Sequence, residues 1–94
     1  MSWSVSAVGR TAAVKKALER QFEAAKNATK WINHENLSVA IVENLVNNEL
    51  DALDGAEYGK AIRVEASGSA STENGKVRSS QVSVKIEPIY GFIE

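Results

Sequence analysis

The stretch KAIRVEASGSASTENGKVRSSQVSVKIE, residues 60–87, changes the spacing of apolar side chains from helical to alternating. In its first and last parts, apolar residues recur at every second position: Ile62, Val64, Ala66, Val82, Val84 and Ile86. A period of two is typical of β-strands, because successive side chains point to opposite faces of a sheet. The stretch therefore predicts a β-hairpin, and it decides the fold class of the chain.

The middle of this hairpin, SGSASTENGKVRSS at residues 67–80, is rich in serine and glycine. Two interpretations compete: the strands extend to meet around Asn74-Gly75, or the segment is a mobile flap. Since small polar residues offer few apolar contacts, we expect it to be the most mobile internal segment. Gly68 is interpreted as a bulge or as the end of a strand.

The beginning of the chain alternates as well. Trp3, Val5 and Ala7 fall on one face, and serines fall on the other. This pattern predicts a half-buried first strand in which Trp3 belongs to the core. Gly9 interrupts the alternation, so the strand is expected to end there.

Two helices are predicted between this strand and the hairpin, from apolar residues at helical spacing. Thr11 is the candidate N-cap of the first, which runs to about Ala28. Asn33 is the candidate cap of the second, and Asp54-Gly55 ends it, because glycine accepts the left-handed conformation that closes many helices. The apolar face of the second helix is expected at Leu37, Ile41 and Leu45, widened by Val42, Val46, Leu50 and Leu53.

The element order β-α-α-β-β predicts an α+β fold, a two-layer sandwich in one domain spanning residues 1–94. A three-stranded, mainly antiparallel sheet packs on an antiparallel helix pair. We expect the last strand in the middle, antiparallel to both others, because its VSVKI pattern is the most regular. Truncating Leu18 or Ile41 to alanine is expected to destabilise the protein by about 2–5 kcal/mol. The predicted core is Val5, Val14, Leu18, Phe22, Leu37, Ile41, Leu45, Ile62, Val64, Val82, Val84 and Ile86.

The composition is that of an ordinary globular domain, with 94 residues, 44% of them hydrophobic, and a net charge of −1. The absence of cysteine excludes disulfides and thiolate chemistry, and it favours a reducing compartment. The N-terminal residues lack the pattern of a secretory signal, and no apolar run approaches the roughly 20 residues that span a bilayer. We therefore expect a cytoplasmic protein that does not bind membranes.

Residues that carry catalysis or bind metal ions are scarce. His34 is the only histidine, so the chain has no His/Cys set for zinc and no base for a serine triad. We interpret it as a solvated residue in the first turn of a helix. Glu49, Asp51 and Asp54 cluster, but they lack the ligand spacing and the turn glycine of a calcium loop. We predict no catalytic residue, no cofactor and no metal, and hence a protein that is not an enzyme.

The two predicted helices carry opposite charges. Residues 10–30 contain six basic and two acidic residues, or +4, whereas residues 34–57 contain six acidic and no basic residues, or −6. Either the two helices face each other with matching edges, or copies of the chain stack basic side to acidic side. A nucleic-acid interpretation is weakened by the near-zero net charge. It would use the candidate basic surface formed by Arg10, Lys15, Lys16, Arg20, Lys26 and Lys30.

Large apolar residues in two places are candidate contacts with a partner. Trp31, in the turn between the helices, is either a lid over the core or an exposed contact. Pro88 lacks a backbone donor, so central strand pairing is expected to end near Glu87. The tail beyond it has apolar residues on both faces, and we predict that it packs partly on another chain. The candidate partner contacts are Trp31, Ile89, Tyr90, Phe92 and Ile93.

Three stretches, MSWSVSAVGR, VEASGSAST and VSVKIEPIYGFIE, resemble small uncharacterised proteins of tailed bacteriophages and prophages. The resemblance brings no catalytic motif, and it implies a host bacterial cytoplasm or a virion as the setting. The leading hypothesis is a non-catalytic phage protein that acts through contacts with another protein or with its own copies. It would be a virion or assembly component, or an accessory factor. The alternative is a small nucleic-acid-binding regulator that uses the basic first helix.

Overall fold

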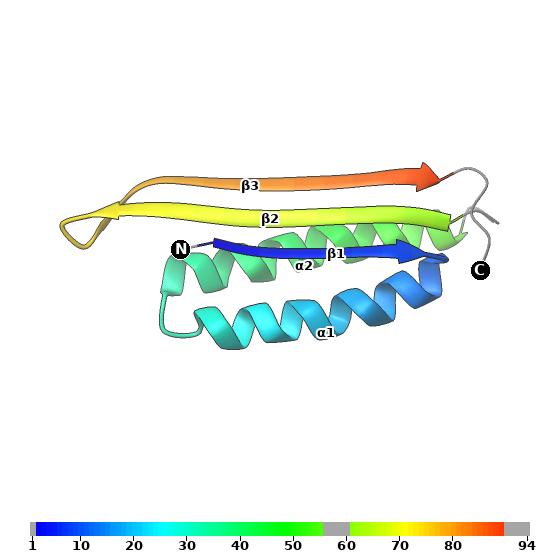
Figure 1. Ribbon diagram of the computed structural model, residues 1–94, viewed down its shortest axis with the longest axis horizontal. Helices are drawn as coiled ribbons and strands as arrows, with labels where there is room; N and C mark the ends of the chain where they lie inside the picture. Colours follow the sequence, from blue (N-terminus) through cyan, green and yellow to red (C-terminus); the bar gives the residue numbers. More distant parts are fainter. Residues whose placement is uncertain (1, 56–60, 90–94) are drawn as a thin grey trace.

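The computed structural model describes residues 2–55 and 61–89, with only the backbone of residues 54 and 55. Two helices and three strands follow one another in the predicted order (Figure 1). The strands are β1 (Ser2–Gly9), β2 (Ala61–Glu73) and β3 (Lys76–Ile89), and the helices are α1 (Thr11–Thr29) and α2 (Asn33–Gly55). The predicted α+β fold is confirmed.

The sheet and the helices form two layers. Figure 1 shows α1 and α2 running antiparallel along one side of the sheet, joined by a short turn. α1 lies mainly against β1, whereas α2 lies against β2 and β3. Both helices are shorter than the β2–β3 hairpin, whose turn projects beyond them and gives an elongated shape of 49 × 21 × 20 Å (Figure 1).

The strand order is β1-β2-β3, with both pairs antiparallel. The prediction that the last strand lies in the middle is therefore wrong. The regular VSVKI pattern carried no information on position, because an edge strand and a central strand alternate alike. Burial identifies the central strand: Ile62 and Val64 of β2 are fully buried, whereas most of β3 is exposed.

The strands of the hairpin extend through the serine-rich segment and meet at Asn74-Gly75. Both turn residues have positive φ, 54° for Asn74 and 77° for Gly75, as two-residue hairpin turns of this sequence require. The extended-strand interpretation is confirmed and the flap interpretation is wrong. A register shift between Ser71 and Thr72 marks the last part of β2 before the turn.

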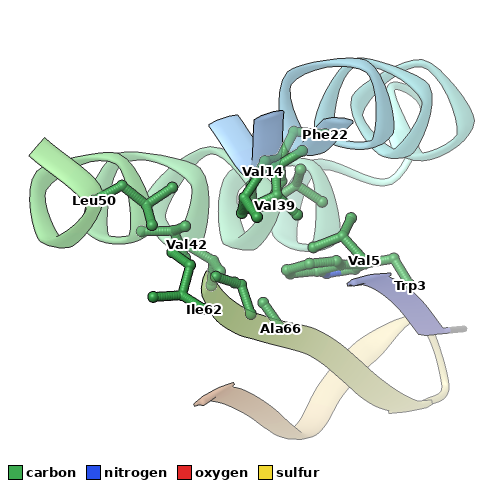
Figure 2. Packing of buried hydrophobic residues seen from close by; sticks show 12 residues of the cluster. Trp3, Val5, Val14, Phe22, Val39, Val42, Leu50, Ile62 and Ala66 are labelled. Atoms are coloured by element: carbon green, nitrogen blue, oxygen red, sulfur yellow. The ribbon is translucent and has the colours of Figure 1, made fainter. Parts of the chain in front are cut away.

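The core lies between the helix pair and β1 and β2. It contains six predicted residues, Val5, Val14, Leu18, Phe22, Ile62 and Val64, as well as Trp3. Ala7, Val84 and Ile86 are partly buried against it. Figure 2 shows side chains from both helices and from β1 and β2 converging on one another. Among the residues that the structure describes, the core members outside the predicted core list are Val39, Val42, Val46, Leu50, Ala61 and Ala66. Val42, Val46 and Leu50 belong to the wider apolar face predicted for the second helix, and Ala66 to the apolar face predicted for the first hairpin strand.

Four predicted core residues are exposed instead: Leu37, Ile41, Leu45 and Val82. α2 carries apolar side chains around more than half of its circumference, but α1 and the sheet can cover only one side of it. The side that turns inward holds Val39, Val42, Val46 and Leu50. Val82 is exposed because β3 is an edge strand and the helices cover mainly its neighbours.

The predicted helix caps are each one residue late. Thr11 is a buried residue of the first turn, and the N-cap is Arg10, whose carbonyl accepts from the Val14 N–H at 2.9 Å. In α2 the Ile32 carbonyl likewise accepts from the Asn36 N–H at 2.9 Å, so the cap position is Ile32 rather than Asn33. Helical hydrogen bonding therefore begins one residue before the side chains that favour a cap.

Gly68 is neither a bulge nor a strand end, because it pairs regularly with Trp3 on β1 and with Val82 on β3. The Trp3 ring lies directly over it: a Cβ at position 68 would overlap Trp3 Nε1 and approach Cε2 to 2.7 Å. Trp3 Nε1 donates to Ser38 Oγ at 3.0 Å, and the ring centroid is 6.3 Å from that of Phe22. Glycine at this position therefore lets the indole cover the sheet and reach α2.

Candidate functional site

The clearest candidate for a functional surface is a row of aliphatic side chains on α2. Leu37, Ile41 and Leu45 are 60%, 56% and 48% exposed, respectively. They follow one another at intervals of four residues, so they line up along one side of the helix. We call these three residues the α2 apolar stripe. Single exposed leucines are common on protein surfaces, but an aligned row of three is typical of a contact surface.

Trp31 lies in the turn before α2 and is 85% exposed. The interpretation of Trp31 as a lid over the core is therefore wrong. Lys30 Nζ lies 5.2 Å from the centroid of its ring, within the range of a cation–π contact. Trp31 remains available as a contact residue at one end of the helix pair.

The tail is described only as far as Ile89. Strand pairing continues through Pro88 to Ile89, opposite Ile62 and Ala61, so the prediction that it ends near Glu87 is wrong. A proline is tolerated here because β3 is an edge strand. Ile89 is half-buried. Three candidate contacts of the tail lie outside the described residues: Tyr90, Phe92 and Ile93.

The opposite charges of the two helices face each other within one molecule, at the solvent-accessible junction of α1 and α2. Lys15 Nζ lies 2.5 Å from Asp51 Oδ1, and Lys26 Nζ lies 2.9 Å from Glu43 Oε1. These pairs border a shallow groove of about 490 Å³ between α1 and α2. The interpretation that the two helices face each other with edges of matching opposite charge is confirmed. Of the candidate basic surface, the remaining members are exposed: Arg10, Lys16, Arg20 and Lys30.

The Lys26–Glu43 contact predicts a small, pH-dependent contribution to stability. The hydrogen bond to Glu43 raises the pKa of Lys26 above its usual 10.5, and attraction by Glu43 and Glu23 adds to the effect. A raised pKa means that the contribution is complete below pH 10.5 and is lost as the pH rises through the folded-state value. Both side chains are partly exposed, so Glu43→Gln should lower the free energy of unfolding by at most about 1 kcal/mol.

The measurement is urea unfolding of the wild type and the Glu43→Gln variant at pH 8 and at about pH 11.5. The difference between the two proteins should shrink at the higher pH. Glu23→Gln is the matched control, because Glu23 lies farther from Lys26 Nζ, at 3.6 Å, and should have a smaller effect. An equal difference at both values of pH would contradict the assigned ion pair.

Groups suited to metal binding do not gather in the described part of the chain. His34 is half-buried rather than solvated, and its Nε2 is buried with no hydrogen-bond partner there. Asp51 of the predicted acidic cluster pairs with Lys15, and the side chain of Asp54 lies outside the described residues. Among residues 2–53 and 61–89, no three His, Asp or Glu side chains lie close enough to hold a metal ion.

The two edges of the sheet differ, a contrast that the sequence pattern does not reveal. On the outer edge of β1, the Gln21 amide holds the backbone of Ser6. Gln21 Oε1 accepts from the Ser6 N–H at 2.8 Å, and Nε2 donates to the Ser6 carbonyl at 2.7 Å. No described side chain hydrogen-bonds to the backbone of β3, whose outer edge has no neighbouring strand in the described sheet. The only sequence signal of the blocked β1 edge would have been a glutamine on the side of α1 that is directed toward a strand.

Neither helix, over its described residues, has an apolar stretch long enough to cross a bilayer. Comparison with known proteins finds no matching family model, no similar curated protein and no similar solved structure. The candidate site therefore consists of surfaces of this chain alone: the α2 apolar stripe, Trp31 and the open edge of β3.

Proposed function

We propose that this is a non-catalytic protein that acts through protein–protein contacts, and that the α2 apolar stripe is a principal contact surface. The observation that carries the proposal is the exposure of Leu37, Ile41 and Leu45 along one side of a helix whose other side is fully packed. Large aliphatic side chains in a row on one helix face fit a hydrophobic groove of a partner, with each residue filling one position.

The placement of apolar residues on α2 strengthens the proposal. The valines Val39, Val42 and Val46 are buried, whereas the larger Leu37, Ile41 and Leu45 face solvent. A helix that served only to cover the sheet would gain nothing from these exposed side chains, because their burial stabilises the protein only when something covers them. Contact with a partner would supply that cover.

The resemblance of the chain ends to phage proteins supplies the proposed setting, a phage-infected bacterium or its virions. The nucleic-acid alternative has less support, because Lys15 and Lys26 of the basic surface already face carboxylates of α2. Phosphates approaching these lysines would also approach Asp51 and Glu43, which repel them.

The test replaces the stripe with polar residues of similar length, in the triple variant Leu37→Gln, Ile41→Gln, Leu45→Gln. Its melting temperature should stay close to that of the wild type, because exposed positions contribute little to stability. When each protein is immobilised and exposed to a lysate of phage-infected bacteria, the variant should lose the proteins that the wild type retains.

The control is the variant Ala24→Gln, Ala28→Gln, which places glutamine at two exposed positions of α1, away from the stripe. This variant should retain whatever the wild type retains. Retention of the same proteins by the triple variant, with its fold intact by circular dichroism, would show that the stripe is not a contact surface.

A further inference from the structure

The geometry points to a second copy of this chain as the occupant of the open β3 edge, with the two β3 strands antiparallel across a two-fold axis. The result is one continuous sheet that joins the three described strands of each copy. This inference rests on the proposed function, since it specifies one of the protein contacts that the proposal assumes.

The first reason is the contrast between the two edges. Gln21 occupies the backbone hydrogen-bonding groups of Ser6 at the outer edge of β1, which prevents another strand from pairing there. β3 is 14 residues long, and its register against β2 is regular from Ser79 to Ile89. A long, regular edge with unpaired N–H and C=O groups is a template for an added strand.

The second reason is the side of β3 that faces the helix layer. Pairing with β2 places Val82, Val84, Ile86 and Pro88 on the same face as the buried residues Ile62 and Val64. α2 covers this face only in part, because Val82 is 57% exposed and Ile86 borders an open groove of about 150 Å³. A strand added beside β3 would continue this apolar face across the joined sheet.

The third reason selects a copy of the same chain. Within the regular part of β3, from Ser79 to Ile89, the only charged side chains are Lys85 and Glu87, which have opposite signs and flank Ile86 on the other face of the sheet. If the two-fold axis passes at Ile86, Lys85 lies opposite the partner's Glu87 and Glu87 lies opposite the partner's Lys85. Oppositely charged residues directly across a strand pair attract each other.

The same arrangement extends a pattern already present within the sheet. Lys85 lies opposite Glu65, and Glu87 lies opposite Arg63, to which it is joined by an ion pair of 3.2 Å. With the second copy in place, positive and negative side chains alternate across the joined sheet, both in the row that contains Arg63 and in the row that contains Glu65. Pro88 lies opposite the partner's Val84 and has no backbone N–H to donate. Strand pairing between the two copies is therefore limited to the residues around Ile86.

The test uses charge reversal at these two positions. Lys85→Glu places like charges at both cross-strand contacts of the dimer, and Glu87→Lys does the same with the opposite sign. Each variant alone should dimerise at least about tenfold more weakly than the wild type. Mixed in equal amounts, the two should form a heterodimer as tightly as the wild type forms its dimer, because each contact then joins a lysine to a glutamate.

Sedimentation of the full chain at low salt, at about 100 μM, measures the mass of each sample, and circular dichroism checks its fold. Lys16→Glu is the matched control, since it makes the same charge change at an exposed position of α1. It should sediment as the wild type does. A wild-type dimer, two weakened single variants and a restored mixture would support the inference.

A wild-type protein that stays monomeric overturns the inference, and so does a dimer that neither charge reversal weakens. The stripe variant separates these failures from failure of the proposed function. A dimer lost only in Leu37→Gln, Ile41→Gln, Leu45→Gln would place the contact on α2, which rejects β3 pairing and keeps the proposed function. If the wild type is monomeric but binds a strand of another protein, the inference of a second copy is rejected and the proposed function is kept.

Discussion

Leu18→Ala should lower the free energy of unfolding by about 2–5 kcal/mol, whereas Ile41→Ala should change it by about 0.5 kcal/mol or less. Leu18 is fully buried in α1, so its truncation removes apolar contacts and leaves a cavity. Ile41 is 56% exposed and leaves none. Since a domain has only about 5–15 kcal/mol of stability in total, the first variant loses a large part of it.

Urea or thermal unfolding of the two variants beside the wild type measures this contrast directly. The sequence alone predicts equal effects, because both residues lie at helical spacing on an apolar face. Equal destabilisation would mean that α2 packs with its other side inward, against the fold described here. It would also remove the apolar stripe from the surface.

The second large effect is expected at Gly68, where an alanine methyl group would overlap Trp3 Nε1 and lie 2.9 Å from Cζ2. The ring must shift, which disturbs its hydrogen bond to Ser38 and its packing on Phe22. Forced overpacking of this kind costs about 1–3 kcal/mol. Gly68→Ala should therefore destabilise the protein, although a methyl group at a strand position is ordinarily favourable.

A double-mutant cycle with Trp3→Phe tests the cause. The phenyl ring lacks the fused five-membered ring and its Nε1, so Gly68→Ala should cost less in the Trp3→Phe background than in the wild type. Unfolding in urea gives all four free energies. The same cost in both backgrounds would show that the strain at Gly68 does not come from the indole.

The sequence was sufficient to predict the elements and their types. Two of the signals are local, because each depends only on how side-chain direction repeats within one strand or helix. They are the alternation at Ile62, Val64 and Ala66 and the helical spacing around Val14 and Leu18. The Asn74-Gly75 turn is local as well, since its two residues tolerate positive φ. For these reasons the element order and the α+β class follow from the chain without further information.

The sequence predicted the candidate site only in part. Trp31 was among the predicted contacts and is exposed. The basic residues were correctly grouped by charge, but their position beside Glu43 and Asp51 depends on how α1 lies against α2. The α2 apolar stripe was assigned to the core, because Leu37, Ile41 and Leu45 recur at helical spacing and mark an apolar face of the helix.

The sequence by itself determined where each strand and helix lies along the chain, because hydrophobic period and turn chemistry act over a few residues. Only the tertiary structure decided which side of α2 faces inward, which strand is central and which sheet edge stays open. The physical reason is that these depend on competition for a limited buried area: α1 and the sheet can cover one side of α2, and two helices cannot cover three strands. The residues left outside, Leu37, Ile41, Leu45 and the edge of β3, are those that the proposed contacts would bury.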